Sequence, residues 1–445
     1  MSIVLPEEIH YIFNKLKDNG YESYVVGGCL RDLILGIPVS DFDLATDAKP
    51  EELMKIFDRT IPTGIKHGTV TLLIKDKAFE ITTYRLEGIY SDHRHPDEVK
   101  FTSSIVEDLS RRDFTINAMA YNEKGLLDPF NGTGDLKLKI IRTVGDANLR
   151  FSEDALRMIR AIRFSCKLSF DFDNAIIPSI QKSFALIENI SHERIREELN
   201  KILLSSKPSK GIYLLEQTNL LRYIIPELIP CIGFNQRNPH HDKDVYNHIL
   251  SVLDFSENNL VGRLCALFHD IGKPECFSID KKGIGHFYNH NKESEIIAYK
   301  ILSRLKYDNT TIKKVCLLIK EHMCIYEGFK DITVKKLINR VGQNNLPDLF
   351  SLLEADSRGH KKEADFSKMD KLQEKVSTIL KSGDPLTIRD LRIDGEDLIN
   401  MGFNRGPIIG ATLKTLLEIV MMRPEDNNKE KLLQKALKLN SISHT

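Results

Sequence analysis

The 445-residue sequence contains no apolar run near the roughly 18 residues that a membrane-spanning helix needs. Its start, MSIVLPEEIHYIF, lacks the basic segment followed by an apolar one that marks a secretory signal. Its 7 cysteines are scattered and include no C-x-x-C pair, so they predict neither a disulfide framework nor a zinc ribbon. We therefore expect a cytoplasmic protein with free thiols and no membrane partner.

An excess of charge of one sign is also absent, because 63 Lys and Arg residues balance 63 Asp and Glu residues. This balance removes the simplest electrostatic argument for a nucleic-acid partner, although it does not exclude a local basic surface. Internal repeats and low-complexity segments are missing as well. With 41% hydrophobic and 28% charged residues, the composition is that of a globular protein rather than a disordered or fibrous one.

The length exceeds what one hydrophobic core usually spans, so the chain is expected to form several domains. The first third alternates strand-like and helix-like stretches, with strands expected at 24–26, 41–45, 69–75 and 78–84. From about residue 141, apolar residues recur at spacings of three and four, which predicts amphipathic helices. The predicted fold class is an α/β head, in which helices lie beside a small mixed sheet, followed by all-α domains with boundaries near residues 140, 235 and 365.

The first chemically informative segment is Gly27-Gly28-Cys29-Leu30-Arg31-Asp32, which follows an apolar strand and precedes a helical stretch. Paired glycines in such a turn let backbone N–H groups approach a phosphate at the start of a helix. In the later segment Asp41-Phe42-Asp43, the strand period of two places both carboxylates on one face. Two such carboxylates suit Mg²⁺, which binds them together with substrate phosphates. Each pattern alone also fits an ordinary turn, but their combination within one short segment favours a nucleotide site with a metal ion.

These residues resemble the first motif of the DNA polymerase β-like nucleotidyltransferases. Across residues 20–205 the chain is similar to the class II tRNA nucleotidyltransferases, the CCA-adding enzymes. The segments that carry the resemblance are GGCLRDLILGIPVSDFDLAT, SRRDFTINAMAYN (110–122), LDPFNGTGDL (127–136), RFSEDALRMIRAIRF (150–164) and SHERIREEL (191–199). The resemblance implies an enzyme that adds C, C and A without a template to the 3′ end of tRNA, using CTP and ATP.

The resemblance also implies roles for parts of the chain and for individual residues. Residues 1–140 would be the catalytic head, and residues 141–235 a helical neck and body that selects the nucleotide and binds RNA. The residues implied for the catalytic Mg²⁺ are Asp41 and Asp43, and those implied for contact with the incoming nucleotide are Gly28, Arg31 and Arg112.

Glu80 is a further candidate in the head, because strand alternation places it opposite its apolar neighbours Phe79 and Ile81. It would be a third carboxylate that orients the hydroxyl of the primer. Transfer of a nucleotidyl group depends on in-line positioning and charge neutralisation, so no nucleophilic serine or cysteine is required.

Asp154 and Arg157 are separated by one turn of a predicted helix, so their side chains are expected side by side. By themselves they also fit an ordinary surface ion pair. The resemblance implies instead that they read the base edge of CTP or ATP, where an acceptor beside donors matches an exocyclic amine and a ring nitrogen. Arg160 and Arg163 follow at three-residue steps and would cover the triphosphate or the RNA end.

Residues 85–110 combine mixed charges with few apolar residues and are predicted to form a mobile loop. In the family a loop of this kind takes part in the switch from C to A addition. Its presence favours synthesis of the whole CCA end over addition of C alone.

Half of the 14 histidines fall between residues 240 and 322. The segment ALFHDIGKP (266–274) resembles the HD-domain phosphohydrolases, which implies such a domain at residues 236–365. Imidazole and carboxylate ligands together suit Mn²⁺, Fe²⁺, Ni²⁺ or Zn²⁺, and a bound ion would supply hydroxide for attack on a phosphoester. The alternative is a degenerate HD fold kept for RNA binding. The implied ligands are His248, His269, Asp270 and Asp356, with His290 and His322 for a second ion.

Residues 366–445 resemble the helical tail of the CCA-adding enzymes, and their basic residues would meet tRNA phosphates. Within the same class, an A-adding enzyme or a poly(A) polymerase stays open. From other classes, the alternatives are an HD phosphohydrolase with a vestigial head and a tRNA-binding protein without catalysis. The intact D-x-D and E-D-x-x-R patterns argue against both.

Overall fold

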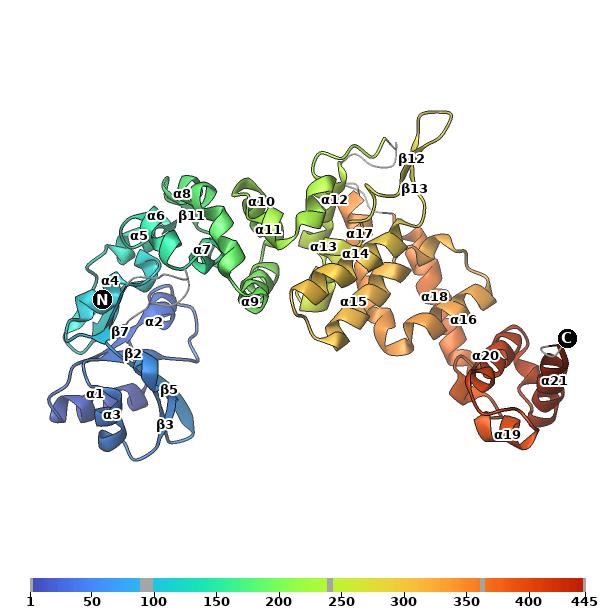
Figure 1. Ribbon diagram of the computed structural model, residues 1–445, viewed down its shortest axis with the longest axis horizontal. Helices are drawn as coiled ribbons and strands as arrows, with labels where there is room; N and C mark the ends of the chain where they lie inside the picture. Colours follow the sequence, from blue (N-terminus) through green and yellow to red (C-terminus); the bar gives the residue numbers. More distant parts are fainter. Residues whose placement is uncertain (1–2, 89–98, 238–242, 361–364, 443–445) are drawn as a thin grey trace. The chain divides into compact units, whose positions relative to one another are not determined.

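The computed structural model describes residues 3–88, 99–237, 243–360 and 365–442. They form two compact units, divided between Pro226 and Glu227. The first unit contains a large sheet with helices, and the second is almost wholly helical (Figure 1). Within the described ranges no helix is both long and apolar enough to cross a membrane. The predicted fold class, an α/β head followed by helices, is confirmed.

The head contains one seven-stranded mixed sheet. Its strands are β1 (Ser23–Val26), β2 (Asp43–Thr46), β3 (Thr60–Gly64), β4 (Thr69–Ile74), β5 (Lys77–Thr83), β8 (Ala120–Asn122) and β9 (Gly125–Leu127). They lie in the order β3-β4-β5-β2-β1-β8-β9, and every neighbouring pair is antiparallel except β2 and β5. The predicted strands correspond to β1, β2, β4 and β5, although β2 begins at Asp43, so Asp41 precedes it.

Five helices accompany this sheet. They are α1 (Glu7–Asp18), α2 (Gly27–Ile34), α3 (Pro50–Ile56), α4 (Ile105–Ser110) and α5 (Gly132–Leu138). In α1 the buried residues Ile9, Ile12, Phe13 and Leu16 recur at spacings of three and four, so one stripe of the helix is buried.

The segment 85–110 differs from the loop that its composition predicts. Its described part contains the antiparallel strands β6 (Arg85–Glu87) and β7 (Val99–Phe101), followed by α4. Helix α4 begins here because the Ser104 side chain accepts a hydrogen bond from the backbone N–H of Glu107. The middle of the predicted loop, residues 89–98, lies outside the described residues.

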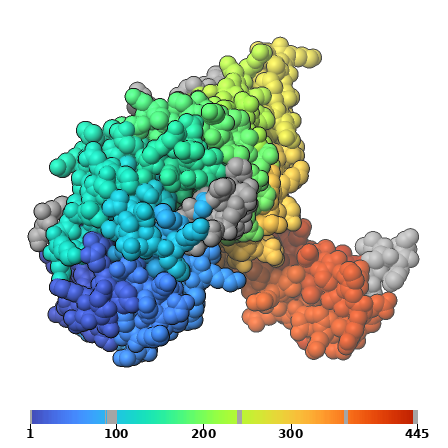
Figure 2. All heavy atoms as spheres, turned by 60° about the vertical axis from the view of Figure 1, so that its left-hand side comes forward, coloured from blue at the N-terminus to red at the C-terminus, as the bar shows by residue number. Residues whose placement is uncertain are grey.

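The rest of the first unit is helical. Its helices are α6 (Ala147–Glu153), α7 (Leu156–Leu168), α8 (Ile176–Ser183), α9 (His192–Leu203), α10 (Pro208–Gln217) and α11 (Leu221–Ile224), with a short parallel pair β10 (Ile140–Ile141) and β11 (Asp171–Phe172). Helix α7 packs against α9 and α10, and its residues Met158, Ile159 and Ile162 are fully buried. The head, in blue, and these helices, in cyan and green, form a continuous surface (Figure 2).

The second unit is a bundle with a smaller helical tail. Its elements are α12 (Val245–Phe255), α13 (Leu260–Phe268), β12 (Phe277–Ile279), β13 (Gly285–Phe287), α14 (His290–Arg304), α15 (Asn309–Glu321), α16 (Asp331–Val341), α17 (Leu346–His360), α18 (Ser367–Ser382), α19 (Gly395–Asn400), α20 (Pro407–Met422) and α21 (Lys429–Ile442). Helix α13 is central, because it packs against α12, α14, α15 and α17 and its last five residues are fully buried. The residues that follow α13, His269 and Asp270, therefore lie in the interior of the bundle.

Candidate active site and candidate metal centre

The turn between β1 and α2 brings backbone close to charged side chains. Gly27 has φ +75°, a conformation that favours glycine. A Cβ on Gly27 would lie 3.0 Å from Nη1 of Arg112 and 3.5 Å from Oδ2 of Asp43. A Cβ on Gly28 would meet only the Arg31 guanidinium, at an ordinary contact distance. Gly27, rather than the predicted Gly28, is therefore the more constrained glycine of the turn.

The predicted carboxylates lie at the start of β2 and on β5. Phe42 is buried, whereas Asp41 and Asp43 reach the surface, as the strand period predicts. Asp43 is in register with Glu80 on the neighbouring strand, so these two side chains share one face of the sheet. Desolvation raises the pKa of Asp43, Arg112 lowers it, and the charges of Glu80 and Asp41 raise it, so that the pKa lies above its ordinary value. This crowding of negative charge favours a bound cation.

One cavity of the first unit, with a volume of about 1060 Å³, is lined by most of the residues predicted to take part in nucleotide addition. Ten Lys and Arg residues line it against three Asp residues, so a chain without net charge carries a local basic surface. Asp41 and Glu80 are not among the lining residues. Those predicted residues that line it are Gly28, Arg31, Asp43, Arg112, Asp154, Arg157, Arg160 and Arg163.

Arg31 and Arg112 are held in place by neighbouring side chains. Arg31 is buried and donates to Oδ1 of Asn117 at 2.6 Å and to Oδ1 of Asp32 at 2.7 Å. Arg112 donates through Nη2 to Asp108 at 3.3 Å. Its buried Nε has no hydrogen-bond partner among the described residues. Two fixed guanidinium groups at a cavity wall suit anionic oxygen atoms.

The structure corrects the expected arrangement of Asp154 and Arg157. Helix α6 ends at Glu153 and α7 begins at Leu156, so Asp154, with extended backbone at φ −133°, does not share a continuous helix with Arg157. Oδ1 of Asp154 accepts from the backbone N–H of Leu156 at 3.0 Å, because the first N–H groups of α7 need acceptors. Oδ2 accepts from Nη2 of Arg194 at 3.0 Å, while Arg157 donates to Glu153 at 2.5 Å. The two side chains line one cavity, but each is paired elsewhere.

Arg160 and Arg163 are each paired with a buried carboxylate. Arg160 donates to Oδ2 of Asp113 through Nε at 2.8 Å and through Nη2 at 2.6 Å. Burial alone would raise the pKa of Asp113, but the Arg160 charge and hydrogen bonds outweigh it and lower the pKa to about 2. Arg163 donates to Oε1 of Glu198 at 3.1 Å, and burial lowers the pKa of Arg163 to about 10. Both arginines therefore hold the cavity wall together as well as line it.

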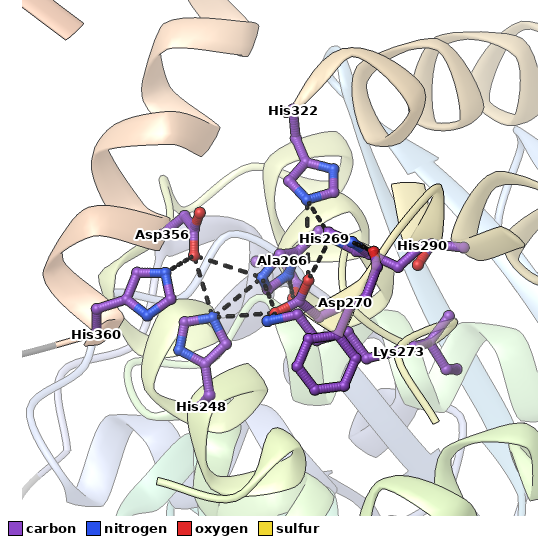
Figure 3. A network of polar contacts seen from close by, with 12 residues as sticks. His248, Ala266, His269, Asp270, Lys273, His290, His322, Asp356 and His360 are labelled. Carbon is purple, nitrogen blue, oxygen red and sulfur yellow. Dashed lines mark hydrogen bonds and ion pairs between the residues drawn. The ribbon is translucent and has the colours of Figure 1, made fainter. Parts of the chain in front are cut away.

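A second site lies in the second unit, where α13 ends (Figure 3). His248 comes from α12, His269 and Asp270 follow α13 directly, and Asp356 comes from α17. The ligand atoms of His248, His269 and Asp356 all lie within 4.8 Å of one another. Nε2 of His248 is 3.1 Å from Oδ1 of Asp356 and 3.3 Å from Oδ2 of Asp270. The fold thus brings together four predicted ligands from two helices and the turn that follows α13.

Asp270 connects this group to a second one, made of Asp270, His290 and His322, whose ligand atoms also lie within 4.8 Å of one another. Its Oδ1 is 3.2 Å from Nε2 of His290 and 3.8 Å from Nε2 of His322. Its Oδ2 faces His248 and His269, each at 3.3 Å. In the part of the chain that the structure describes, only these two groups bring three such ligand atoms this close together. Asp270 thus faces both groups, and each group would offer a cation imidazole and carboxylate ligands together.

The charges in this second site are balanced by protons. Burial would lower the pKa of His269, but the Asp270 carboxylate outweighs it and raises the pKa to about 10. Burial and the neighbouring imidazoles lower the pKa of His322 to about 3. Although burial opposes it, His269 and Lys273 hold the pKa of Asp270 well below its usual range. A protonated imidazole therefore neutralises the carboxylates at a place that also suits a metal cation.

Two residues at this site were not predicted. Nζ of Lys273 lies 2.6 Å from Oδ2 of Asp270. The His360 ring stacks on His248 with its centroid 4.3 Å away, and its Nε2 lies 3.2 Å from Oδ1 of Asp356. His360 follows Asp356 by four positions on α17, so helical spacing is a signal that could have identified it. Lys273 lies in the turn after α13, three positions beyond Asp270.

The sheet, the glycine turn with its carboxylates and the basic cavity define a nucleotidyltransferase with a catalytic α/β head. Residues 23–142 match the poly(A) polymerase head domain, residues 169–232 the RNA and SrmB binding site of polymerase A, and residues 287–436 tRNA nucleotidyltransferase domain 2. Over 434 residues the chain is 35% identical to the CCA-adding enzyme of Ligilactobacillus salivarius (strain UCC118), covering 96% of this chain and 95% of that one. The chain therefore belongs to the family of CCA-adding enzymes, which are tRNA nucleotidyltransferases.

Solved structures agree with this family. The chain is similar to the CCA-adding enzyme of Bacillus stearothermophilus solved with CTP, with a TM-score of 0.69 and 28% identity over 99% of both chains. It shares the fold of the Thermotoga maritima CCA-adding enzyme solved with tRNA, with a TM-score of 0.61, 22% identity and coverage of 98% of this chain and 96% of that one. Nucleotidyltransferases of this family use a divalent metal ion.

Proposed function

We propose that the cavity of the first unit adds C, C and A, without a template, to the 3′ end of tRNA, using CTP and ATP. The observation that carries this proposal is the basic cavity, which joins the glycine turn, Asp43 and the Asp154–Arg157 segment. The solved relative with bound CTP, at 28% identity, supports CTP as one substrate. Because tRNA is the other substrate, we place the enzyme in the cytoplasm.

Asp41 and Asp43 are proposed to hold Mg²⁺, because an all-oxygen ligand set suits this ion and because Asp43 lies in crowded negative charge. When bound, the ion neutralises charge on the phosphate under attack. Glu80, in register with Asp43, is proposed to accept a hydrogen bond from the 3′ hydroxyl of the primer and so to orient it. No side-chain nucleophile takes part, since positioning and charge neutralisation suffice for this transfer.

The triphosphate is proposed to bind at the start of α2. Backbone N–H groups at Gly28 and the helix N-terminus attract phosphate oxygens. Arg31, fixed by two hydrogen bonds, and Arg112, with one buried N–H not used by described residues, add charged donors. Arg160 and Arg163 line the same cavity and are proposed to contact the triphosphate or the RNA end.

Nucleotide choice is proposed to rest on Asp154 and Arg157. An ionised carboxylate accepts from the N4 amine of cytosine or the N6 amine of adenine, and a guanidinium donates to the ring nitrogen beside it. Uracil and guanine present a carbonyl oxygen and a ring N–H at these places, so the carboxylate repels them. Since Arg157 is paired with Glu153, the base must compete for it or use its remaining N–H groups.

The test is a nucleotide-addition assay on tRNA that ends at its discriminator base, with each labelled nucleotide given alone and in combination. With CTP alone the tRNA is expected to gain two nucleotides, and with CTP and ATP together it is expected to gain three. Addition of A to tRNA that already ends in CC, without any addition of C, would show an A-adding enzyme. Long products from ATP alone would show a poly(A) polymerase.

We propose a second function for the second unit, hydrolysis of phosphoesters with a transition metal such as Mn²⁺, Fe²⁺, Ni²⁺ or Zn²⁺. The observation in its favour is the pair of buried ligand groups that Asp270 connects. Imidazole-rich sites select softer ions than carboxylate sites do. The test is release of product from bis(p-nitrophenyl) phosphate and from 2′,3′-cyclic nucleotides by metal-stripped protein to which each ion is returned. No hydrolysis with any ion would show that this unit is a scaffold.

We infer four functional regions from these assignments. They are the catalytic head (1–140), the helical neck and body (141–235), the HD-type region (236–365) and a tail (366–445) that binds tRNA through basic residues. The match to tRNA nucleotidyltransferase domain 2 covers residues 287–436, so it supports a tRNA-related role for most of the HD-type region as well as for the tail. Limited proteolysis, followed by tRNA binding of the fragments, tests these boundaries.

A further inference from the structure

Helix α9 supports the cavity through two charged residues that lie one turn apart. Arg194 donates to Asp154 at 3.0 Å, and Glu198 accepts from Arg163 at 3.1 Å. The helix itself is anchored by its buried apolar residues, which include Ile195 and Leu199. A rigid element therefore fixes two side chains of the cavity wall.

The Asp154 carboxylate is held at both of its oxygens. Oδ1 accepts from the backbone N–H of Leu156, and Oδ2 accepts from Nη2 of Arg194. The first contact uses the backbone and is available to any folded chain. The second comes from α9, another element of the fold, and it fixes the plane of the carboxylate. Arg194 also lines the cavity, and its buried Nη1 has no hydrogen-bond partner among the described residues.

We infer that Arg194 is a positioning residue for nucleotide selection. It holds the Asp154 carboxylate in one orientation, so that the two oxygen atoms accept from an exocyclic amine and repel a carbonyl oxygen. Without Arg194 the carboxylate rotates about its own bonds, and the penalty for uracil or guanine falls. This inference rests on the proposed role of Asp154 in reading the base.

The experiment compares kcat/KM for CTP and UTP in single and double variants of the full chain. The variants are Arg194→Gln, Arg194→Lys, Asp154→Asn and Arg194→Gln with Asp154→Asn. Arg222→Gln, an exposed arginine of α11 outside the cavity, controls for loss of one positive charge. Thermal unfolding of each variant identifies any that do not fold, and Arg194→Lys replaces Arg194→Gln if the latter is unfolded.

Arg194→Gln is expected to reduce the preference for CTP over UTP about tenfold or more, because small displacements of a reading group cost factors of this order. Arg194→Lys keeps the positive charge but not the planar guanidinium group, so it is expected to lose less of the preference for CTP over UTP. The double variant is expected to discriminate no worse than Asp154→Asn alone, because Arg194 acts through Asp154.

Three results overturn the inference. If Asp154→Asn leaves the preference unchanged, the proposed role of Asp154 fails, and the inference fails with it. If Asp154→Asn relaxes the preference but folded Arg194 variants slow CTP and UTP equally, the proposed role stands and Arg194 is only structural. If the double variant loses the CTP preference of both single variants added together, Arg194 acts on the nucleotide independently of Asp154.

Discussion

The two candidate sites offer a cation different ligands in different surroundings. In the head, Asp41, Asp43 and Glu80 provide only oxygen atoms beside an open basic cavity. In the second unit, imidazoles and carboxylates meet inside a helical bundle, and the side chains of His269 and Asp270 are at most 3% exposed. The first site therefore suits an ion that arrives with a nucleotide, whereas the second suits a resident ion.

Removing one carboxylate of the head gives the largest expected effect. Asp43→Ala is expected to slow nucleotide addition by about 10³-fold or more, because metal-assisted charge neutralisation supplies several kcal/mol to the transfer. The thermal stability of the protein should not fall, because the variant removes one of several crowded negative charges. The measurement is single-turnover addition of C, with Asp76→Ala, an exposed residue in the turn before β5, as the control. Near-normal addition would move the metal site away from this strand.

Removing one imidazole tests whether the two sites work independently. His269→Ala is expected to reduce metal-stimulated phosphoester hydrolysis by about 10²-fold or more, since outer-shell changes alone cost up to that much. Addition of CCA with Mg²⁺ should stay within about twofold of the wild-type rate. His286→Ala, a histidine of β13 that pairs with Asp280, is the control. A folded His269→Ala protein that no longer adds nucleotides contradicts the division of labour between the units.

Metal ions should stabilise the two units differently. In metal-stripped protein, Mn²⁺, Ni²⁺ or Zn²⁺ at about 100 times its dissociation constant is expected to add about 2.7 kcal/mol to the stability of the second unit. Mg²⁺ at the same concentration should add much less, because imidazole is a poor ligand for it. Calorimetry of the full chain follows this change, and Asp356→Ala should abolish it. Equal stabilisation by Mg²⁺ would count against a histidine-rich centre.

The smallest expected effect concerns an ion pair of the first unit. Asp113→Asn should lower the free energy of unfolding by about 2 kcal/mol at pH 7, because Arg160 depresses the pKa of Asp113 to about 2. A depressed carboxyl pKa stabilises the fold fully above about pH 4. The difference between variant and wild type should therefore shrink as the pH falls toward 2. Denaturant unfolding between pH 7 and pH 2 measures this difference in the free energy of unfolding. If the difference does not change with pH, the ion pair between Asp113 and Arg160 is not its cause.

Local sequence patterns determined the elements that carry both sites. Strand alternation predicted that Asp41 and Asp43 share one face; both are exposed and Phe42 between them is buried, although the strand itself begins only at Asp43. The glycine pair predicted a strand-to-helix turn, and α2 begins at Gly27. These patterns are readable because each depends on residues within one or two turns of the chain.

Only the tertiary structure decided which side chains are paired. Asp154 and Arg157 looked like neighbours on one helix, but the backbone leaves the helix at Asp154, and the partner of this carboxylate is Arg194, 40 residues away. Arg160 is likewise paired with Asp113, 47 residues away. The strands, helices and candidate ligands could be predicted from the sequence alone, because periodicity and turn chemistry are local. It left the partners of those ligands open, because they depend on how distant helices pack and on which buried charges must be neutralised once water is excluded.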